Sequence, residues 1–313
     1  MELTSATTGG NSLSVSGNTA TATIVTTSLA TGDDVLVAAN APAGNFAGVA
    51  DETGFNAKTE GIESAVLSSS DNTKEINTNI PMYGASTLNG SGSAFTAAVS
   101  VQHQLAKITL DDLEVAFDAN GPYKEAEFTP TEFFLVNVPE KLAFNSNAWV
   151  NGASHLHGMS STTYSSLTAA TEWGTYKEYL SSAATGSTAL KGTSDTYASK
   201  SYFYVTPCDD ASTDGKMKLI IAGTFKTNSS DAGTTVFYPV AINATYAADG
   251  TPSAATNGGA DVFKVYPNKN YKCKVVIKTI GTTDPTKNLD PQTATVTVTV
   301  TDFVDASQTT TFE

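Results

Sequence analysis

The chain has 313 residues, a size that fits one large all-β domain or two ordinary domains. Its formal net charge of −14 argues against nucleic acid and anionic membranes as partners, and no run of about 18 apolar residues is present to span a membrane. Charged residues are 15% of the chain, against about 25% in an ordinary globular protein, so the composition favours an extracellular β protein over a cytosolic enzyme.

Stretches with strand character alternate with clusters of Gly, Asn, Asp, Ser and Pro, which is the pattern of a β-sandwich. In the first part of the chain, we expect strands at residues 20–27, 34–39, 94–101 and 105–117. In the second part, we expect them at residues 133–138, 201–206, 216–226, 235–243, 271–280 and 294–304. The predicted fold class is therefore all-β.

Two segments have helical spacing instead. Residues 61–70 place Ile62, Val66 and Leu67 on one face, and residues 171–182 do the same with apolar and aromatic side chains. We expect both to be short helical excursions that cover an edge of a sandwich.

A domain boundary is expected within residues 118–130, which hold Gly121, Pro122 and several charges but few apolar side chains. This predicts an N-terminal domain over residues 1–120 and a C-terminal domain over residues 121–313. In both domains, short predicted strands alternate with turn-rich segments, as in a β-sandwich.

Two further features of composition stand out. All 17 basic residues are Lys and none is Arg, which reflects either drift or selection against Arg, for example to survive an Arg-specific protease. Cys208 and Cys273 are the only cysteines, and they are either one disulfide or two unpaired thiols.

Catalytic and metal sites are not favoured by the residues. His155 and His157 would share one face of a strand, but their surroundings read as a Ser/Gly-rich loop without a nearby carboxylate. His103 lies in a strand pattern and is interpreted as structural. The acidic pairs cannot face one sugar together, because neighbours in a strand point to opposite faces: Asp33–Asp34, Asp111–Asp112 and Asp209–Asp210. We expect no enzyme activity, no cofactor and no metal.

The most regular strand lies near the C-terminus. Residues 293–301 read "TATVTVTVT", with a strict period of two and β-branched side chains at nearly every position. One face carries Ala294, Val296, Val298 and Val300, whereas Phe303 breaks the parity. A strand without Pro or charge near a chain end is also an aggregation hazard.

Several segments, in order, resemble the fimbrillin family, the type V pilins of Bacteroidales. They are "DDVLVAANAPAG" (33–44), "NIPMYGAS" (79–86), "VQHQLAKITLDDLEV" (101–115), "FFLVNVP" (133–139), "SYFYVTP" (201–207), "MKLIIAGTFK" (217–226), "VFYPVAIN" (236–243) and the C-terminal block 268–303. The last block, with its Asn-Lys-x-Tyr strand and Gly-Thr-x-x-Pro loop, is the most specific. Phe303 stands where the family often has Trp, and the first 30 residues match poorly.

The resemblance implies two transthyretin-like β-sandwiches in tandem and a structural role. Such pilins are exported as lipoproteins, reach the outer membrane of a Gram-negative bacterium, and are soluble once the lipid anchor is lost. A maturation protease, Arg-specific in the best-known systems, removes an N-terminal strand, and the hydrophobic groove that this leaves in the N-terminal domain accepts the C-terminal segment of a neighbouring subunit. We therefore expect partners to be copies of this chain, other fimbrial subunits, the protease and a host or bacterial surface ligand.

The expected donor is the segment 293–313. Its named residues are Ala294, Val296, Val298, Val300, Phe303, Val304 and Phe312. An alternative stays open: residues 293–301 complete the chain's own fold, and only the tail after Asp302 is donated. We expect any export leader and the processing site to lie upstream of Met1.

Two other functions compete with a fimbrial stalk that supports adhesion and biofilm formation. A tip or accessory adhesin of the same family needs a groove but no donor strand. A surface glycan-binding protein needs an exposed aromatic platform, for which Trp149 and Trp173 are the candidates.

Overall fold

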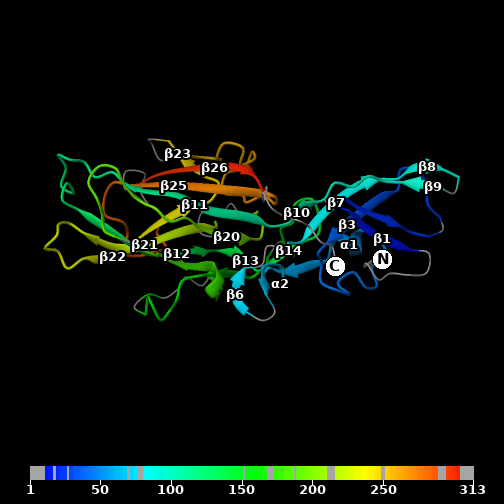
Figure 1. The fold of residues 1–313 in the computed structure, drawn as a ribbon, viewed down its shortest axis with the longest axis horizontal. Helices are drawn as coiled ribbons and strands as arrows, with labels where there is room; N and C mark the ends of the chain where they lie inside the picture. Colours follow the sequence, from blue (N-terminus) through cyan, green and yellow to red (C-terminus); the bar gives the residue numbers. More distant parts are fainter. Residues whose placement is uncertain are drawn as a thin grey trace.

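The computed structural model describes residues 11–16, 19–26, 28–68, 71–75, 80–92, 94–150, 152–165, 167, 173–186, 188–209, 216–247, 251–287 and 294–303. Figure 1 shows an elongated molecule. The strands from the C-terminal part gather at one end, and the strands β1, β3, β7, β8 and β9 lie at the other.

The first large sheet is built around β11. Its strands follow the order β19-β11-β25-β26, and β20 pairs with β11 beside β19. Only β11 and β25 run parallel, and the other pairs are antiparallel. The bounds are β11 (Ala106–Val115), β19 (Asp195–Tyr197), β20 (Ser201–Val205), β25 (Lys269–Ile277) and β26 (Ala294–Asp302).

The second large sheet is antiparallel throughout. Its order is β17-β12-β21-β22, and β18 also pairs with β12. The bounds are β12 (Glu127–Val136), β17 (Ser181–Ala183), β18 (Leu190–Lys191), β21 (Lys218–Lys226) and β22 (Thr234–Ala241).

The two large sheets share one apolar core. β11 alternates buried and half-buried residues along its length, which is the signature of a strand with one face inside. β21 is buried on both faces for most of its length, because the first sheet covers one face, and Met159, Tyr164, Leu167 and Trp173 pack on the other. The main cluster includes Ile108, Leu110, Phe128, Phe133, Leu219, Ile221, Tyr238, Tyr271, Val275 and Val298.

The N-terminal end is built from smaller sheets. A three-stranded sheet has the order β10-β7-β3, with bounds β3 (Asp34–Ala39), β7 (Met82–Thr87) and β10 (Gln102–His103). β4 (Thr59–Gly61) pairs with β14 (Lys141–Ala143) and thereby ties this end to the C-terminal sandwich. Ile62 and Ile80 join the main core, so the two ends share continuous apolar packing.

Short hairpins and one small sheet complete the β structure. The small sheet contains β13 (Val138–Pro139), β15 (His155–His157) and β16 (Thr175–Tyr176). The hairpins are β1 (Ser12–Ser16) with β2 (Thr19–Thr23), β5 (Leu67–Ser68) with β6 (Asp71–Glu75), β8 (Asn89–Ser91) with β9 (Ala94–Thr96), and β23 (Thr245–Tyr246) with β24 (Pro252–Ser253).

Helix is scarce in the described residues. α1 (Glu52–Asn56) is capped by Asp51, whose Oδ1 accepts from the Gly54 N–H at 2.7 Å. α2 (Ile62–Val66) lies within the helical segment expected at residues 61–70. The second expected helix, at residues 171–182, is wrong: among its described residues the chain forms β16, a 3-10 turn at Glu178–Leu180, and β17.

Gly174 explains that error. Its φ of 78° is left-handed, and a Cβ there would lie 1.8 Å from the His155 carbonyl oxygen. The backbone therefore leaves helical geometry at residue 174 and pairs with β15 instead. His155 and His157, expected in a loop, lie in that strand, which corrects the loop assignment.

The remaining expectations fare variously. The expected strand at 34–39 is confirmed, that at 20–27 is found over Thr19–Thr23, and residues 94–101 form strand only over Ala94–Thr96. The expected strands from 105–117 onward are confirmed with shifted ends, except that residues 133–138 are divided at Asn137 between β12 and β13. Cys208 and Cys273 are both buried, and no disulfide joins them. β11 precedes residue 120 yet pairs only with strands from the C-terminal part.

Candidate functional site: the terminal strand and the N-terminal sheet

β26 is the terminal strand singled out by its sequence. Ala294, Val298 and Val300 are at most 5% exposed, and Val296 is half-buried against the same core. The Thr residues between them face outward. The period of two thus becomes one apolar face turned to the chain's own sandwich.

Backbone pairing fixes β26 along its whole length. It runs antiparallel to β25, from Ala294 opposite Ile277 to Asp302 opposite Lys269. The Lys269 ammonium lies 2.7 Å from the Asp302 carboxylate and closes the end of the ladder. Strand 294–302 therefore completes the C-terminal sheet.

Phe303 continues this attachment beyond the strand. Its N–H donates to the Asn268 carbonyl at 2.9 Å, and its ring is 5% exposed. The ring packs edge-on against His103 at 4.8 Å between centroids and lies 5.4 Å from Tyr204. Phe303 is the last residue of the chain that the structure describes. The candidate donor residues Val304 and Phe312 therefore lie outside the described residues.

The edges of both large sheets are partly occupied. At the outer edge of β26, Thr299 forms a parallel bridge with Thr256. At the outer edge of β22, Phe237 exchanges two backbone hydrogen bonds with Thr282, at 2.7 and 3.1 Å. Such bridges block a sheet edge against pairing with another chain.

β3 presents a different kind of edge. It pairs with β7 on one side, and within the described ranges no strand pairs with its other side. Its residues Val35 to Ala39 are all only half-buried. No described residue from 11 to 59 is buried, so this end of the molecule has little closed core.

Apolar side chains remain accessible around this sheet. Phe46, Phe55 and Tyr83 form a half-buried aromatic cluster, with 4.6 Å between the first two rings and 6.3 Å between the last two. Ile24, Val25 and Leu29 are 50%, 70% and 41% exposed. An unpaired strand edge beside accessible apolar groups is suited to strand addition.

The residues considered for catalysis do not assemble. In the described residues, no three His, Cys, Asp or Glu side chains are placed to hold a metal ion. His157 is 5% exposed, and burial lowers its pKa. His103 packs against Phe303 instead of facing a carboxylate pair. Asp111 and Asp112 bind Lys200 and Lys274 in ion pairs, and Asp210 lies outside the described residues.

The two tryptophans differ in environment. Trp173 is 1% exposed and packs on the outer face of the second sheet. Trp149 is half-buried, and its ring centroid lies 6.0 Å from that of Tyr266. Only Trp149 therefore remains a candidate for a surface platform. None of the helices in the described ranges is long and apolar enough to cross a membrane.

No protein-family model and no curated protein matches the sequence, but solved structures match the fold. A putative cell adhesion protein from Bacteroides eggerthii has a TM-score of 0.60 at 23% identity, over 91% of this chain and 82% of that chain. A fimbrilin from Porphyromonas gingivalis has a TM-score of 0.56 at 20% identity, over 89% and 82%. This chain has the fimbrilin fold. A putative cell adhesion protein from Parabacteroides distasonis adds a TM-score of 0.61 at 14% identity, over 93% and 81%.

The fimbrilin fold confirms the prediction of an all-β chain built as tandem β-sandwiches. It also confirms, at the level of fold, the resemblance found in the sequence. The sequence resemblance implied an acceptor groove in the N-terminal domain, but it did not identify β3 as an open edge, because a strand's missing partner leaves no signal in its own residues. The half-buried state of β3 depends on packing between segments that are distant in sequence, so its own residues do not predict it.

Proposed function

We propose that this chain is a structural, non-enzymatic subunit of a cell-surface fimbria, assembled head to tail with copies of itself and with other fimbrial subunits. The fimbrilin fold and the low-charge, acidic composition support this role. A heterologous contact of this type propagates as a filament instead of closing into a ring. In this role the chain supports adhesion and biofilm formation.

The open edge of β3 carries the proposal. A strand from another subunit that pairs there satisfies backbone N–H and C=O groups that now face outward. Its side chains alternate between the two faces of the sheet, so one set covers Val35 and Val37 and the other covers the opposite face, where Tyr83 lies beside Phe55. The N-terminal sheet is therefore the acceptor.

The donated strand begins after Phe303 in this proposal. Residues 294–303 already satisfy their backbone and bury their apolar face within the chain. Their withdrawal would open the core around Tyr271 and Val275. The tail 304–313, with Val304 and Phe312 as apolar anchors, is then the donor, and the division between acceptor and C-terminal domains falls before β11 instead of at residue 120.

Maturation and location complete the proposal. An N-terminal strand is removed from a lipid-anchored precursor by a protease that cuts after Arg, and the mature subunit then resides in a fimbria at the outer membrane. The absence of Arg from the chain supports this order, because a mature subunit offers such a protease no second site.

Two truncations test where the donor begins. Removal of residues 304–313 is expected to leave the thermal unfolding temperature unchanged and to abolish filaments in electron micrographs. Removal of residues 293–313 is expected to prevent folding. Normal filaments from chain 1–303 would contradict donation by the tail.

The same truncated chain mimics a tip subunit, which has an acceptor edge but no donor strand, and so allows a stalk role to be compared with a tip role. Because chain 1–303 keeps the acceptor edge but has no tail, it should bind the end of growing filaments and shorten them when mixed with the full chain.

Lysines on the edge strand test the acceptor: the double variant Val35→Lys/Val37→Lys should block assembly. The matched control, Thr295→Lys/Thr301→Lys on the exposed face of β26, places its lysines opposite Val276 and Asn270 and should assemble normally. Equal loss in both variants would contradict the assignment of β3.

A further inference from the structure

A surface depression in the C-terminal sandwich lies apart from both assembly elements. Its lining includes Trp149, His155, Pro207 and Asp209. Tyr266 extends the aromatic surface beside Trp149, with the two rings tilted by 58°. Aromatic side chains next to a few fixed polar groups are the usual components of a small-molecule site.

The backbone beneath this depression is firmly held. Cys208 and Val265 exchange two backbone hydrogen bonds, at 2.9 and 2.8 Å, and Trp149 forms a bridge with Leu142. The Tyr266 N–H donates to the Tyr271 hydroxyl at 2.9 Å, which connects the loop to β25. The aromatic pair is therefore attached to sheet structure on both sides.

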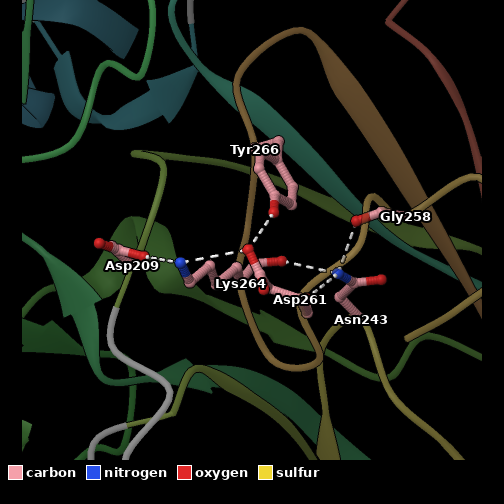
Figure 2. Close-up of polar contacts among 6 residues, drawn as sticks. All are labelled: Asp209, Asn243, Gly258, Asp261, Lys264 and Tyr266. Carbon is pink, nitrogen blue, oxygen red and sulfur yellow. Dashed lines mark hydrogen bonds and ion pairs between the residues drawn. The ribbon is translucent and has the colours of Figure 1, made fainter. Parts of the chain in front are cut away.

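Asn243 fixes the loop that carries Lys264 and Tyr266. It is fully buried, and its Nδ2 donates to the carbonyls of Gly258, Asp261 and Lys264 at 2.7, 3.1 and 2.9 Å. Figure 2 shows the amide nitrogen of Asn243 turned toward Gly258 and the neighbouring loop residues. Gly258 is required there, because a Cβ would lie 1.8 Å from the Asn243 Oδ1. The loop is thus preorganised by a buried side chain.

The polar rim is a network of opposite charges. Lys264 lies between Asp209 at 2.6 Å and Asp261 at 3.2 Å, and the Tyr266 hydroxyl donates to Asp261 at 3.0 Å (Figure 2). The ammonium is 5.6 Å from the centre of the Trp149 ring. The side chains of Asp209 and Asp261 are 35% and 54% exposed; the Asp209 Oδ1 that faces Lys264 is buried, so Oδ2 is the Asp209 oxygen offered to a ligand.

We propose that this depression binds a neutral carbohydrate. The apolar face of a pyranose ring stacks on Trp149, and its hydroxyls donate to Asp209 and Asp261, whose two oxygens each accept several hydrogen bonds. A cationic ligand is disfavoured because Lys264 already occupies the position between the carboxylates. An anion is disfavoured because two carboxylates outnumber one ammonium.

This site is independent of filament assembly, since neither β3 nor β26 contributes to it. Its occupant would be a glycan on another cell or in the extracellular matrix. Carbohydrate binding by a subunit that fails to polymerise would leave the inference intact, and polymerisation without carbohydrate binding would overturn this inference alone.

Saturation-transfer NMR on the full chain is the direct test. The probes are trisaccharides of glucose, mannose, galactose and N-acetylglucosamine, each at about 10 mM because single-site sugar affinities are often on the order of 1 mM. We expect at least one probe to show transfer, strongest at the protons of its apolar ring face. No transfer to any probe would overturn the inference.

Variants locate the binding. Trp149→Ala and Asp261→Asn should each weaken the bound probe by about tenfold or more. Trp173→Phe, which alters the buried tryptophan, should leave affinity unchanged, and it leaves Trp149 as the single tryptophan whose fluorescence can be titrated. Full affinity in both Trp149→Ala and Asp261→Asn would overturn the site. If Trp149→Ala does not fold, the affinity of Asp261→Asn and the quenching of Trp149 fluorescence in Trp173→Phe still test whether the sugar binds at this site.

Discussion

Glu60 is a buried carboxylic acid at the connection between the two ends of the molecule. It lies on β4 opposite Leu142 and is 5% exposed. Its Oε1 accepts from the Ser64 hydroxyl at 3.0 Å. Desolvation outweighs this hydrogen bond and raises the pKa of Glu60 to about 7.

The raised pKa makes stability depend on pH. Because the folded state binds the proton more tightly than the unfolded state, the contribution of Glu60 is greatest below a pH of about 4.5 and is lost as pH rises towards 7. The loss is roughly 3 kcal/mol at most. Glu60→Gln should remove this slope in urea unfolding measured from pH 5 to 8. The control Glu63→Gln, which alters the half-exposed partner of Lys177, should keep it; an unchanged slope in Glu60→Gln would contradict the assignment.

At the scale of elements, β26 is expected to behave as an integral strand. Val298→Ala should lower the free energy of unfolding by roughly 1–3 kcal/mol, because it leaves a cavity in the core. Thr297→Ala, on the exposed face, should cost less than about 1 kcal/mol. Urea denaturation of the two variants measures the difference. Equal costs would mean that the alternation of β26 does not determine its packing.

The N-terminal sheet should open more readily than the C-terminal sandwich. β3 has no buried residue and a single strand partner, whereas β11 lies between β25 and a second partner strand. Amides in Val35–Val37 should therefore be protected from hydrogen exchange about 100-fold less than those in β11. Mass spectrometry of exchange in the monomer tests this, with β25 as the protected control. In filaments, protection at β3 should rise; equal protection of β3 and β11 in the monomer would contradict the open edge.

These elements also show what the sequence could predict. The strand at 34–39 and the period of β26 are local patterns, and both are found in the structure. The helix expected at 171–182 failed because Gly174 contacts His155, a residue distant in sequence. The partner of β26 was equally hidden, since register across sheets depends on loop closure and packing between segments. Trp149 was identified as a candidate, but Tyr266 and the loop held by Asn243 were not.

Across the whole molecule, buried core and paired strand edges are distributed unevenly. The C-terminal sandwich has a closed core and a bridge at the outer edges of β22 and β26, whereas the N-terminal sheet has an open edge at β3 and accessible apolar groups. A chain that is complete at one end and incomplete at the other has one direction in which to add strands. This polarity is what a head-to-tail filament requires.

The absence of Arg is a property of the whole chain and leads to the last prediction. An Arg-specific protease should leave both the folded and the heat-loosened protein intact, because all 17 basic residues are Lys. Lys287→Arg restores one site at a side chain that is 70% exposed, and that variant should be cut before the terminal strand. In cells that mature fimbrial precursors with such a protease, Lys287→Arg should lose filaments, whereas the control Lys287→Gln should keep them. Normal filaments from Lys287→Arg, or cleavage of the parent chain after Lys, would remove protease resistance as the reason for the missing Arg.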